Sequence, residues 1–266
     1  MSALTPNRLI ESVQQKKCCL GMYIETPSSQ IVELACLAGV DFVRLDLCHG
    51  AWDLEQAEKC IITAERYGVV PMVRMSMDEQ RIPQIIELGA QGVIIPDIST
   101  RERAQKAADL VKFAPLGDRG LFSASRQGQY GKVPAAEYIR WNNDNVLLAV
   151  QIESREAIEN IDEILSVDGI DMVLSGRGDL SNSLGVPGEK THPAVLEAEQ
   201  RIFSKALERG KIISPQLDGF SKNLAQELKE WNSIGAYVVS LGVETAIIRR
   251  SFSDMLSRAR QENATA

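Results

Sequence analysis

Polar side chains follow several apolar, β-branched segments of this sequence, and these are the residues best suited to do chemistry. Two carboxylates, Glu153 and Asp179, come after the segments at 146–152 and 170–175. Mg²⁺ is commonly held by one or two carboxylates together with water and substrate oxygens, and Mn²⁺ or Co²⁺ suits the same oxygen site. The pair therefore predicts a divalent-metal site. In a purely structural role, Glu153 would stabilise the start of a helix and Asp179 would cap one.

His49 and Asp46 follow the apolar segment at 41–46 and are candidates for proton transfer. Histidine titrates near neutral pH, and a carboxylate three residues earlier would hold the ring in one tautomer and orientation. The alternative is a surface histidine in a loop. The second histidine, His192, precedes Pro193 at an expected helix start, so a structural role is favoured for it.

Arg74 ends an apolar segment, where an unpaired charge would be expensive. It must therefore meet a buried carboxylate or bind an anion, for example an enolate oxygen. Gln151 stands two residues before Glu153 at another strand end, as a candidate substrate contact. The stretch at 176–179 is expected to begin a short helix whose free N–H groups would accept a substrate carboxylate.

These side chains can act together only if the elements before them share one architecture. Eight short apolar segments have the pattern of strands buried on both faces of a parallel sheet. Amphipathic, helix-like segments alternate with them. The strands are expected at 20–24, 41–46, 70–74, 92–96, 146–152, 170–175, 211–215 and 236–241, and the helices at 28–38, 54–67, 101–112, 155–165, 193–209 and 221–231.

This alternation predicts an α/β fold, a single (β/α)₈ TIM barrel with parallel strands over residues 1–266. The carboxyl ends of barrel strands surround the active site, so the candidate side chains would meet there. A doubly wound open sheet is the second possibility, but its Gly-x-Gly-x-x-Gly loop is missing after the first strand. The glycine-rich segment at about 113–145 is expected to be a long loop with a role in function or oligomer contacts.

The composition narrows the class of partner. The chain has 29 Lys+Arg against 36 Asp+Glu, a net charge of −7, and a sequence pI of about 5.1, so nucleic acid is not an expected partner. There is no apolar run of membrane-spanning length and no signal-peptide pattern, so we expect no membrane partner and a cytoplasmic location. Five cysteines without C-x-x-C spacing indicate reduced thiols.

As an ordered set, the motifs of this chain resemble those of the HpcH/HpaI-type metal-dependent class II pyruvate aldolases. That family includes 4-hydroxy-2-oxoheptanedioate aldolase and 2-dehydro-3-deoxygalactarate aldolase. The resemblance runs over roughly residues 18–240. The motifs that carry it are Gly21-Met-Tyr, the run from Ala38 to Asp46 continuing to His49-Gly50, Pro71-Met-Val-Arg74, the run from Gly89 to Pro96, Arg119-Gly120, Gln151-Ile-Glu153 with Ser-Arg-Glu-Ala after it, and Gly176-x-x-Asp-Leu-Ser181 with His192-Pro193.

The resemblance implies a role for each matching residue. The matches to Glu153 and Asp179 would bind Mg²⁺, Mn²⁺ or Co²⁺, which chelates the keto and carboxylate oxygens of pyruvate. The match to Arg74 would steady the enolate, and the match to the Asp46–His49 pair would move the proton through a bound water.

The same resemblance has further implications for the substrate contact and for assembly. The match to Gly178 would offer its N–H to the substrate carboxylate, and family members form hexamers that exchange their last helix. Two positions depart from the family pattern: Cys48 replaces a glutamate before His49, and Arg177 replaces a proline after Gly176. Arg177 would either grip a second substrate carboxylate or point to solvent.

The leading hypothesis is a divalent-metal-dependent aldolase that reversibly cleaves a 4-hydroxy-2-oxoacid to pyruvate and an aldehyde. Its partners would be a small anionic oxoacid and an aldehyde, and the protein would be a homo-oligomer. The alternative is a citrate synthase-like condensation of oxaloacetate with acetyl-CoA for siderophore biosynthesis. A non-catalytic barrel that binds an organic acid is a third hypothesis, which rests on the change at Cys48.

Overall fold

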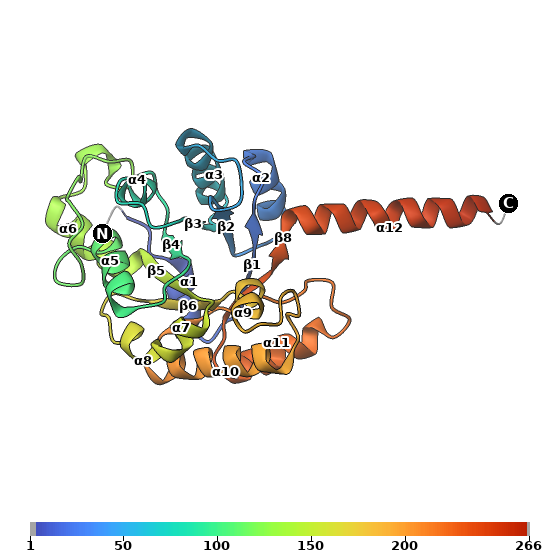
Figure 1. The fold of residues 1–266 in the computed structure, drawn as a ribbon. Coiled ribbons are helices and arrows are strands. Elements are labelled where there is room, and N and C mark those ends of the chain that lie inside the picture. Colours follow the sequence, from blue (N-terminus) through green and yellow to red (C-terminus); the bar gives the residue numbers. More distant parts are fainter. Residues whose placement is uncertain (1–3, 265–266) are drawn as a thin grey trace.

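Eight parallel strands form one sheet in the computed structural model of the chain, which describes residues 4–264 (Figure 1). The order is β7-β6-β5-β4-β3-β2-β1-β8, and a bridge between Gln216 and Ser240 joins its two ends. The predicted (β/α)₈ barrel is therefore confirmed. The strands are β1 (Cys19–Ile24), β2 (Phe42–Asp46), β3 (Val70–Arg74), β4 (Gly92–Ile95), β5 (Leu147–Ile152), β6 (Met172–Ser175), β7 (Ile212–Ile213) and β8 (Val238–Val243).

The strands are as deeply buried as their near-continuous apolar sequences predict. Every residue of β2, β4 and β5 is buried, because one face lines the barrel interior and the other faces the helices. The strand expected at 211–215 is the exception in length. Only Ile212–Ile213 pairs with β6, and Pro215 has no N–H group with which to continue the ladder.

The strand register sets the depth of each inward-facing side chain. Asp46 pairs with Arg74 at the carboxyl ends of β2 and β3. Two residues deeper, Arg44 pairs with Tyr23 on one side and with Met72 on the other. Because side chains alternate along a strand, Arg44 and Asp46 share the interior face of β2 at different depths.

Capping residues position most of the expected helices. The side chains of Ser28, Thr100 and Ser154 each accept a hydrogen bond from the backbone N–H three residues later, and Asp53 forms a capping box with Gln56. The helices are α1 (Arg8–Gln14), α2 (Ser29–Leu37), α3 (Leu54–Arg66), α4 (Arg81–Glu87), α5 (Arg101–Val111), the 3₁₀ turn η1 (Gln129–Gly131), α6 (Ala135–Asn145), α7 (Arg155–Glu159), α8 (Ile161–Ile164), α9 (Arg177–Ser183), α10 (Pro193–Glu208), α11 (Leu224–Ser233) and α12 (Glu244–Ala264).

Two helical regions differ from the expectation. The segment at 155–165 is divided at Asn160, whose side-chain amide donates to the Ser99 carbonyl oxygen at 2.9 Å instead of facing solvent. The stretch at 113–145 is loop only in its first part, because α6 (Ala135–Asn145) occupies its end. Pro134 immediately before α6 was the available signal, since proline favours helix starts.

The last helix, α12, runs away from the barrel as a single long helix in Figure 1. Its first residue, Glu244, is held by the backbone N–H groups of Glu25 and Thr26 at 2.9 and 2.7 Å. Further along, Phe252 and Met255 are each 60% exposed. The helix is therefore fixed at its base and leaves apolar side chains uncovered by this chain.

The buried apolar side chains form two clusters. The larger one fills the layer between the strands and the surrounding helices. The smaller one lies inside the barrel and includes Leu9 of α1, so α1 closes the amino end of the barrel. The carboxyl end is left for polar side chains. Among the described residues, no helix combines the length and the apolar character needed to cross a membrane.

Candidate active site

The barrel brings the predicted site residues to one end. Asp46 and Arg74 are the last residues of β2 and β3, and Gln151 is near the end of β5. Glu153 follows β5 directly, while Asp179 lies in the first turn of α9, just after β6. Since all eight strands are parallel, these positions surround the same barrel mouth.

Arg74 and Asp46 form a two-pronged ion pair. The Nε of Arg74 donates to Oδ1 of Asp46 at 3.1 Å, and Nη2 donates to Oδ2. Burial lowers the pKa of Arg74, but the hydrogen bonds and charge of Asp46 outweigh it and raise that pKa above its ordinary value. The carboxylate partner expected for Arg74 is thus Asp46, and the guanidinium is fixed in orientation at the barrel mouth.

Glu153 is a buried carboxyl group whose pKa is raised by its surroundings. Its side chain accepts hydrogen bonds from the Asp97 backbone N–H at 2.9 Å and from Gln151 Nε2 at 2.5 Å. Burial, opposed by the Asp97 N–H and supported by the charge of Asp179, raises the pKa of Glu153 to about 7. A Cβ atom at Gly176 would come within 2.2 Å of Glu153 Oε2, so only glycine permits this packing.

The donor set on this side fits a hard divalent cation. Glu153 and Asp179 offer carboxylate oxygens, and Gln151 Oε1 is buried without a hydrogen-bond partner. A cation would remove the unfavourable electrostatics of Glu153, and oxygen ligands are those that Mg²⁺ and Mn²⁺ prefer. Within residues 4–264, no three His, Cys, Asp or Glu side chains form a ligand cluster by themselves, so water and substrate would have to complete the coordination.

His49 lies beside the site without the contact expected for it. The imidazole is exposed, and no hydrogen bond joins it to Asp46 in the described part of the chain. Asp46 instead accepts from Arg74 and from the Cys48 backbone N–H, the latter at 3.0 Å. The side chain of Asp46 is therefore paired with Arg74, and no contact with Asp46 fixes the orientation of the His49 imidazole.

Cys48 occupies the position next to His49 at the edge of the mouth. Its sulfur lies 3.9 Å from the Ser76 hydroxyl. Burial is the main cause that raises the pKa of the Cys48 thiol, although the charge of Arg74 opposes it. The side chain is thus a neutral thiol at neutral pH, at the position where the resemblance implies a glutamate.

Arg177 is paired within the protein. Its Nε donates to both carboxylate oxygens of Glu199, at 2.9 and 3.0 Å, and Nη2 donates to Oε2. The Ser175 hydroxyl also donates to this carboxylate. Arg177 therefore neither points to solvent nor stands free in the mouth. It ties the start of α9 to α10.

Asp97 and Glu199 shape the site but were not identified from the sequence. Asp97 has a positive φ of 55°, an uncommon conformation for a residue other than glycine. Arg103 holds it there, with Nε donating to the Asp97 carbonyl oxygen at 2.8 Å. Asp97 follows the end of β4, so the strand-end rule used for the other residues would have found it. Glu199 lies on α10 and had no such signal.

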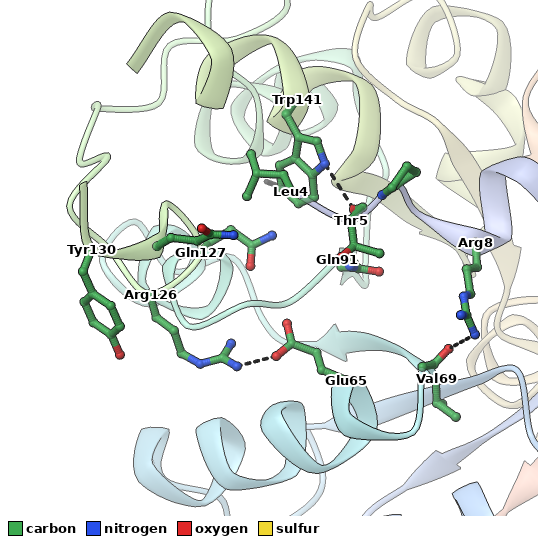
Figure 2. Close-up of a pocket in the computed structure, with 13 residues that line it drawn as sticks. Leu4, Thr5, Arg8, Glu65, Val69, Gln91, Arg126, Gln127, Tyr130 and Trp141 are labelled. Carbon is green, nitrogen blue, oxygen red and sulfur yellow. Dashed lines mark hydrogen bonds and ion pairs between the residues drawn. The ribbon is translucent and has the colours of Figure 1, made fainter. Parts of the chain in front are cut away.

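A cavity of about 550 Å³ lies at the opposite, amino end of the barrel. Figure 2 shows its wall, where Arg126 pairs with Glu65 and the Trp141 indole donates to the Thr5 carbonyl oxygen at 3.2 Å. Val69 and Gln91 also line it, and both immediately precede strands. None of the predicted site residues lines this cavity, so it is separate from the barrel mouth.

Comparison with known sequences identifies the family of this chain. The profile of the family described as HpcH/HpaI aldolase/citrate lyase matches residues 19–250. A 2-keto-3-deoxy-L-rhamnonate aldolase of Shigella sonnei is 31% identical over 263 residues, which cover 97% of this chain and 93% of the relative. The protein of the same name in Escherichia coli K12 is 30% identical over the same shares.

Solved structures give the same result. An HpcH/HpaI aldolase from Desulfitobacterium hafniense DCB-2 superposes with a TM-score of 0.88 at 25% identity, over 96% of this chain and 97% of that structure. The citrate synthase SbnG superposes with a TM-score of 0.87 at 26% identity, over 96% and 98%. The predicted family resemblance is confirmed: this chain belongs to the HpcH/HpaI aldolase/citrate lyase family.

Proposed function

We propose that this protein is a divalent-metal-dependent aldolase that reversibly cleaves a 4-hydroxy-2-oxoacid to pyruvate and an aldehyde. The observation that carries the proposal is that a paired arginine and two unpaired carboxylates lie at the same barrel mouth. A fixed guanidinium, Arg74, lies near two carboxylates, Glu153 and Asp179, that have no ion-pair partner among the described side chains. Relatives about 30% identical over nearly the whole chain are aldolases, which supports the same reaction class.

Glu153 and Asp179 would hold the cation, which would supply positive charge to stabilise the oxygens of the substrate. Arg74 donates hydrogen bonds to the oxygen on which negative charge develops, and Asp46 keeps that guanidinium in place. Gln151 and the N–H of Gly178 are the proposed further contacts of the oxoacid. We expect these groups to bind the enolate more tightly than the substrate.

His49 is the proposed proton carrier, because it is an accessible imidazole at the same mouth. In cleavage, a base removes the proton of the C4 hydroxyl group, the C3–C4 bond breaks, and its electron pair forms the enolate while the aldehyde leaves. A proton then returns to C3 to give pyruvate. Arg177 would meet a second substrate carboxylate only by exchanging its partner Glu199.

Citrate formation from oxaloacetate and acetyl-CoA is the second candidate. The observation in its favour is the close superposition with the citrate synthase SbnG. Release of the free thiol of coenzyme A from acetyl-CoA, dependent on oxaloacetate, would identify that reaction. An aldolase gives no thiol release under the same conditions.

We also infer that the protein is a homo-oligomer, a hexamer by the family resemblance. Support comes from α12, which projects from the barrel in Figure 1. Its side chains Phe252, Met255 and Leu256 are exposed. Exposed apolar side chains on one helix are typical of a contact with another chain. Sedimentation of the full chain, compared with a Phe252→Asp, Met255→Asp variant, tests this, and a variant that remains assembled would contradict it.

The proposed chemistry is tested by proton exchange at C3 of pyruvate in deuterated water, followed by NMR. We expect exchange with added Mg²⁺ or Mn²⁺ and none with EDTA. Exchange that persists both in EDTA and in a Glu153→Ala variant would refute the metal-dependent mechanism. Absence of exchange under all conditions would refute the pyruvate enolate.

A further inference from the structure

Arg44 is a fully buried arginine in the interior of the barrel, with 0% of its side chain exposed. It lies on the inward face of β2, two residues deeper than Asp46. The guanidinium crosses the interior to Ser214, to whose hydroxyl oxygen Nη2 donates. Arg44 is therefore placed directly below the mouth, in a layer that barrels of this kind usually fill with apolar side chains.

The surroundings of Arg44 leave its charge without a counter-charge. No carboxylate of the described residues forms an ion pair with it, and its Nε and Nη1 make no hydrogen bond. The rings of Phe42 and Tyr23 lie 4.9 and 5.3 Å from its Cζ atom, so the guanidinium is partly stabilised by aromatic faces. Burial lowers the pKa of Arg44, Tyr23 raises it, and the charge of Arg74 lowers it further.

Tyr23 connects this buried charge to the site. Its ring lies 5.2 Å from the Cζ atom of Arg74, a distance close to that from Arg44. Tyr23 is itself only 5% exposed, so little water separates the two guanidinium groups. In such surroundings charge interactions are weakly screened, so an anion bound beside Arg74 would be attracted by the charges of both arginines.

We propose that Arg44 is a specificity-determining residue for anions at the barrel mouth, because the bound oxoacid supplies the negative charge that the interior of the barrel lacks. The inference rests on the proposed function. Arg44 acts at a distance and does not touch the substrate, so it favours the more negatively charged form of any ligand. An oxoacid dianion, or an enolate, gains more from it than a monoanion does.

Arg44 also changes the net charge of the mouth and of the layer directly below it. Two arginines, Arg44 and Arg74, stand against three carboxylates, Asp46, Glu153 and Asp179. A divalent cation would change that balance from one negative to one positive charge. Binding of a monoanionic oxoacid then brings the sum to zero, and a dianion brings it to one negative charge. With methionine at position 44 the same site would already be neutral before the anion arrives.

The test compares pyruvate, a monoanion, with oxalate, a dianion that has the charge and the chelating oxygens of the pyruvate enolate. Dissociation constants are measured by calorimetry at a constant free Mg²⁺ concentration, for the wild-type chain and for Arg44→Met. The interaction with Arg44 scales with ligand charge. We therefore expect about threefold weaker binding of pyruvate and about tenfold weaker binding of oxalate in the variant.

A second measurement separates this role from simple packing. Replacing a buried, unpaired charge by an apolar side chain is often neutral or stabilising. We expect the melting temperature of metal-free Arg44→Met to equal or exceed that of the wild-type protein. The matched control is Arg119→Met, because Arg119 is also buried with an unbonded Nε but lies between Phe113 and Tyr138, away from the mouth. This control should leave the preference for oxalate over pyruvate unchanged.

Each outcome has a distinct meaning. Equal affinities of Arg44→Met and wild type for both anions would overturn the inference, as would an equal loss for both anions together with a lower melting temperature. If wild-type protein binds neither anion in the presence of Mg²⁺, the proposed aldolase function fails instead. A loss that grows with ligand charge, at undiminished stability, supports Arg44 as a determinant of specificity.

Discussion

The two halves of the barrel mouth differ in whether their charged side chains are paired. On β2 and β3, Asp46 and Arg74 neutralise one another through a two-pronged ion pair. After β5 and β6, the charge of Asp179 helps to raise the pKa of Glu153, and neither carboxylate has an ion-pair partner among the described side chains. The charges of the first half are balanced within the protein, whereas the second half is the one that we propose to bind a cation. Under the proposed function, the β2–β3 half would orient the ligand and the β5–β6 half would hold the cation that binds it.

Glu153→Gln should produce the largest effect, because it removes one of two carboxylates from the incomplete half. An amide of the same shape keeps the packing but not the charge that holds the cation. We expect pyruvate proton exchange to fall by about 10³-fold or more, since several kcal/mol of stabilisation are lost. Calorimetry with Mn²⁺ should show the matching loss of metal binding. Unchanged metal affinity would remove Glu153 from the ligand set.

Arg74→Lys should produce the next largest effect, in the half that is already paired. Lysine retains the positive charge but cannot make both contacts with Asp46, so the ammonium group of the side chain is no longer held in one orientation. We expect exchange to fall by about 10²-fold with metal affinity nearly unchanged. Parallel loss of metal affinity would show that the two halves are not separable in this way.

The metal-free protein should lose stability as pH rises, through Glu153. Its pKa in the folded state is raised to about 7, so the folded state binds the proton more tightly than the unfolded chain does. The resulting stabilisation, about 3 kcal/mol, is fully present below the unfolded pKa and is lost as pH rises through about 7. Thermal melting in EDTA between pH 4.5 and 8 should show this decline, and Glu153→Gln should lack it. Added Mg²⁺ should restore stability at pH 8 in the wild type only.

Arg177→Met should have the smallest effect on catalysis, because this arginine is already neutralised by Glu199 although it belongs to the β5–β6 half. We expect exchange with pyruvate to stay within about threefold of the wild type, while stability falls by about 3 kcal/mol because Glu199 keeps a buried charge. The double variant Arg177→Met, Glu199→Met should recover most of that stability. A selective loss for dicarboxylate substrates would instead place Arg177 in the site.

Several features of the fold could be predicted from local sequence because local physics decides them. The strand at 70–74 was expected with the bounds that it has, since a buried strand ends where Arg74 needs a polar environment. The helix of 101–112 was identified by Thr100, which caps it. By contrast, the glycines of the stretch at 113–145 predict a loop throughout, whereas the structure has α6 at its end.

The candidate site could also be predicted only in part from the local sequence. The positions of Asp46, Arg74 and Glu153 followed from the rule that barrel strands present their carboxyl ends to the active site. Their partners did not follow from it. Asp46 was expected to orient His49 but pairs with Arg74, and Arg177 pairs with Glu199 from a helix more than twenty residues away. Each choice depends on which groups lie within hydrogen-bond distance after folding.

The sequence by itself determined the alternation of strands and helices, the family motifs and the polar side chains at the strand ends, because these depend on residue type and spacing along the chain. Only the tertiary structure decided which charges are paired and which are left unpaired. Arg44 makes the difference clear. In the sequence it is one charged residue inside an apolar strand, and closure of the barrel buries it beneath Tyr23 and Arg74 without a carboxylate. Charge interactions depend on distance and on the exclusion of water, and both are set only when distant strands meet.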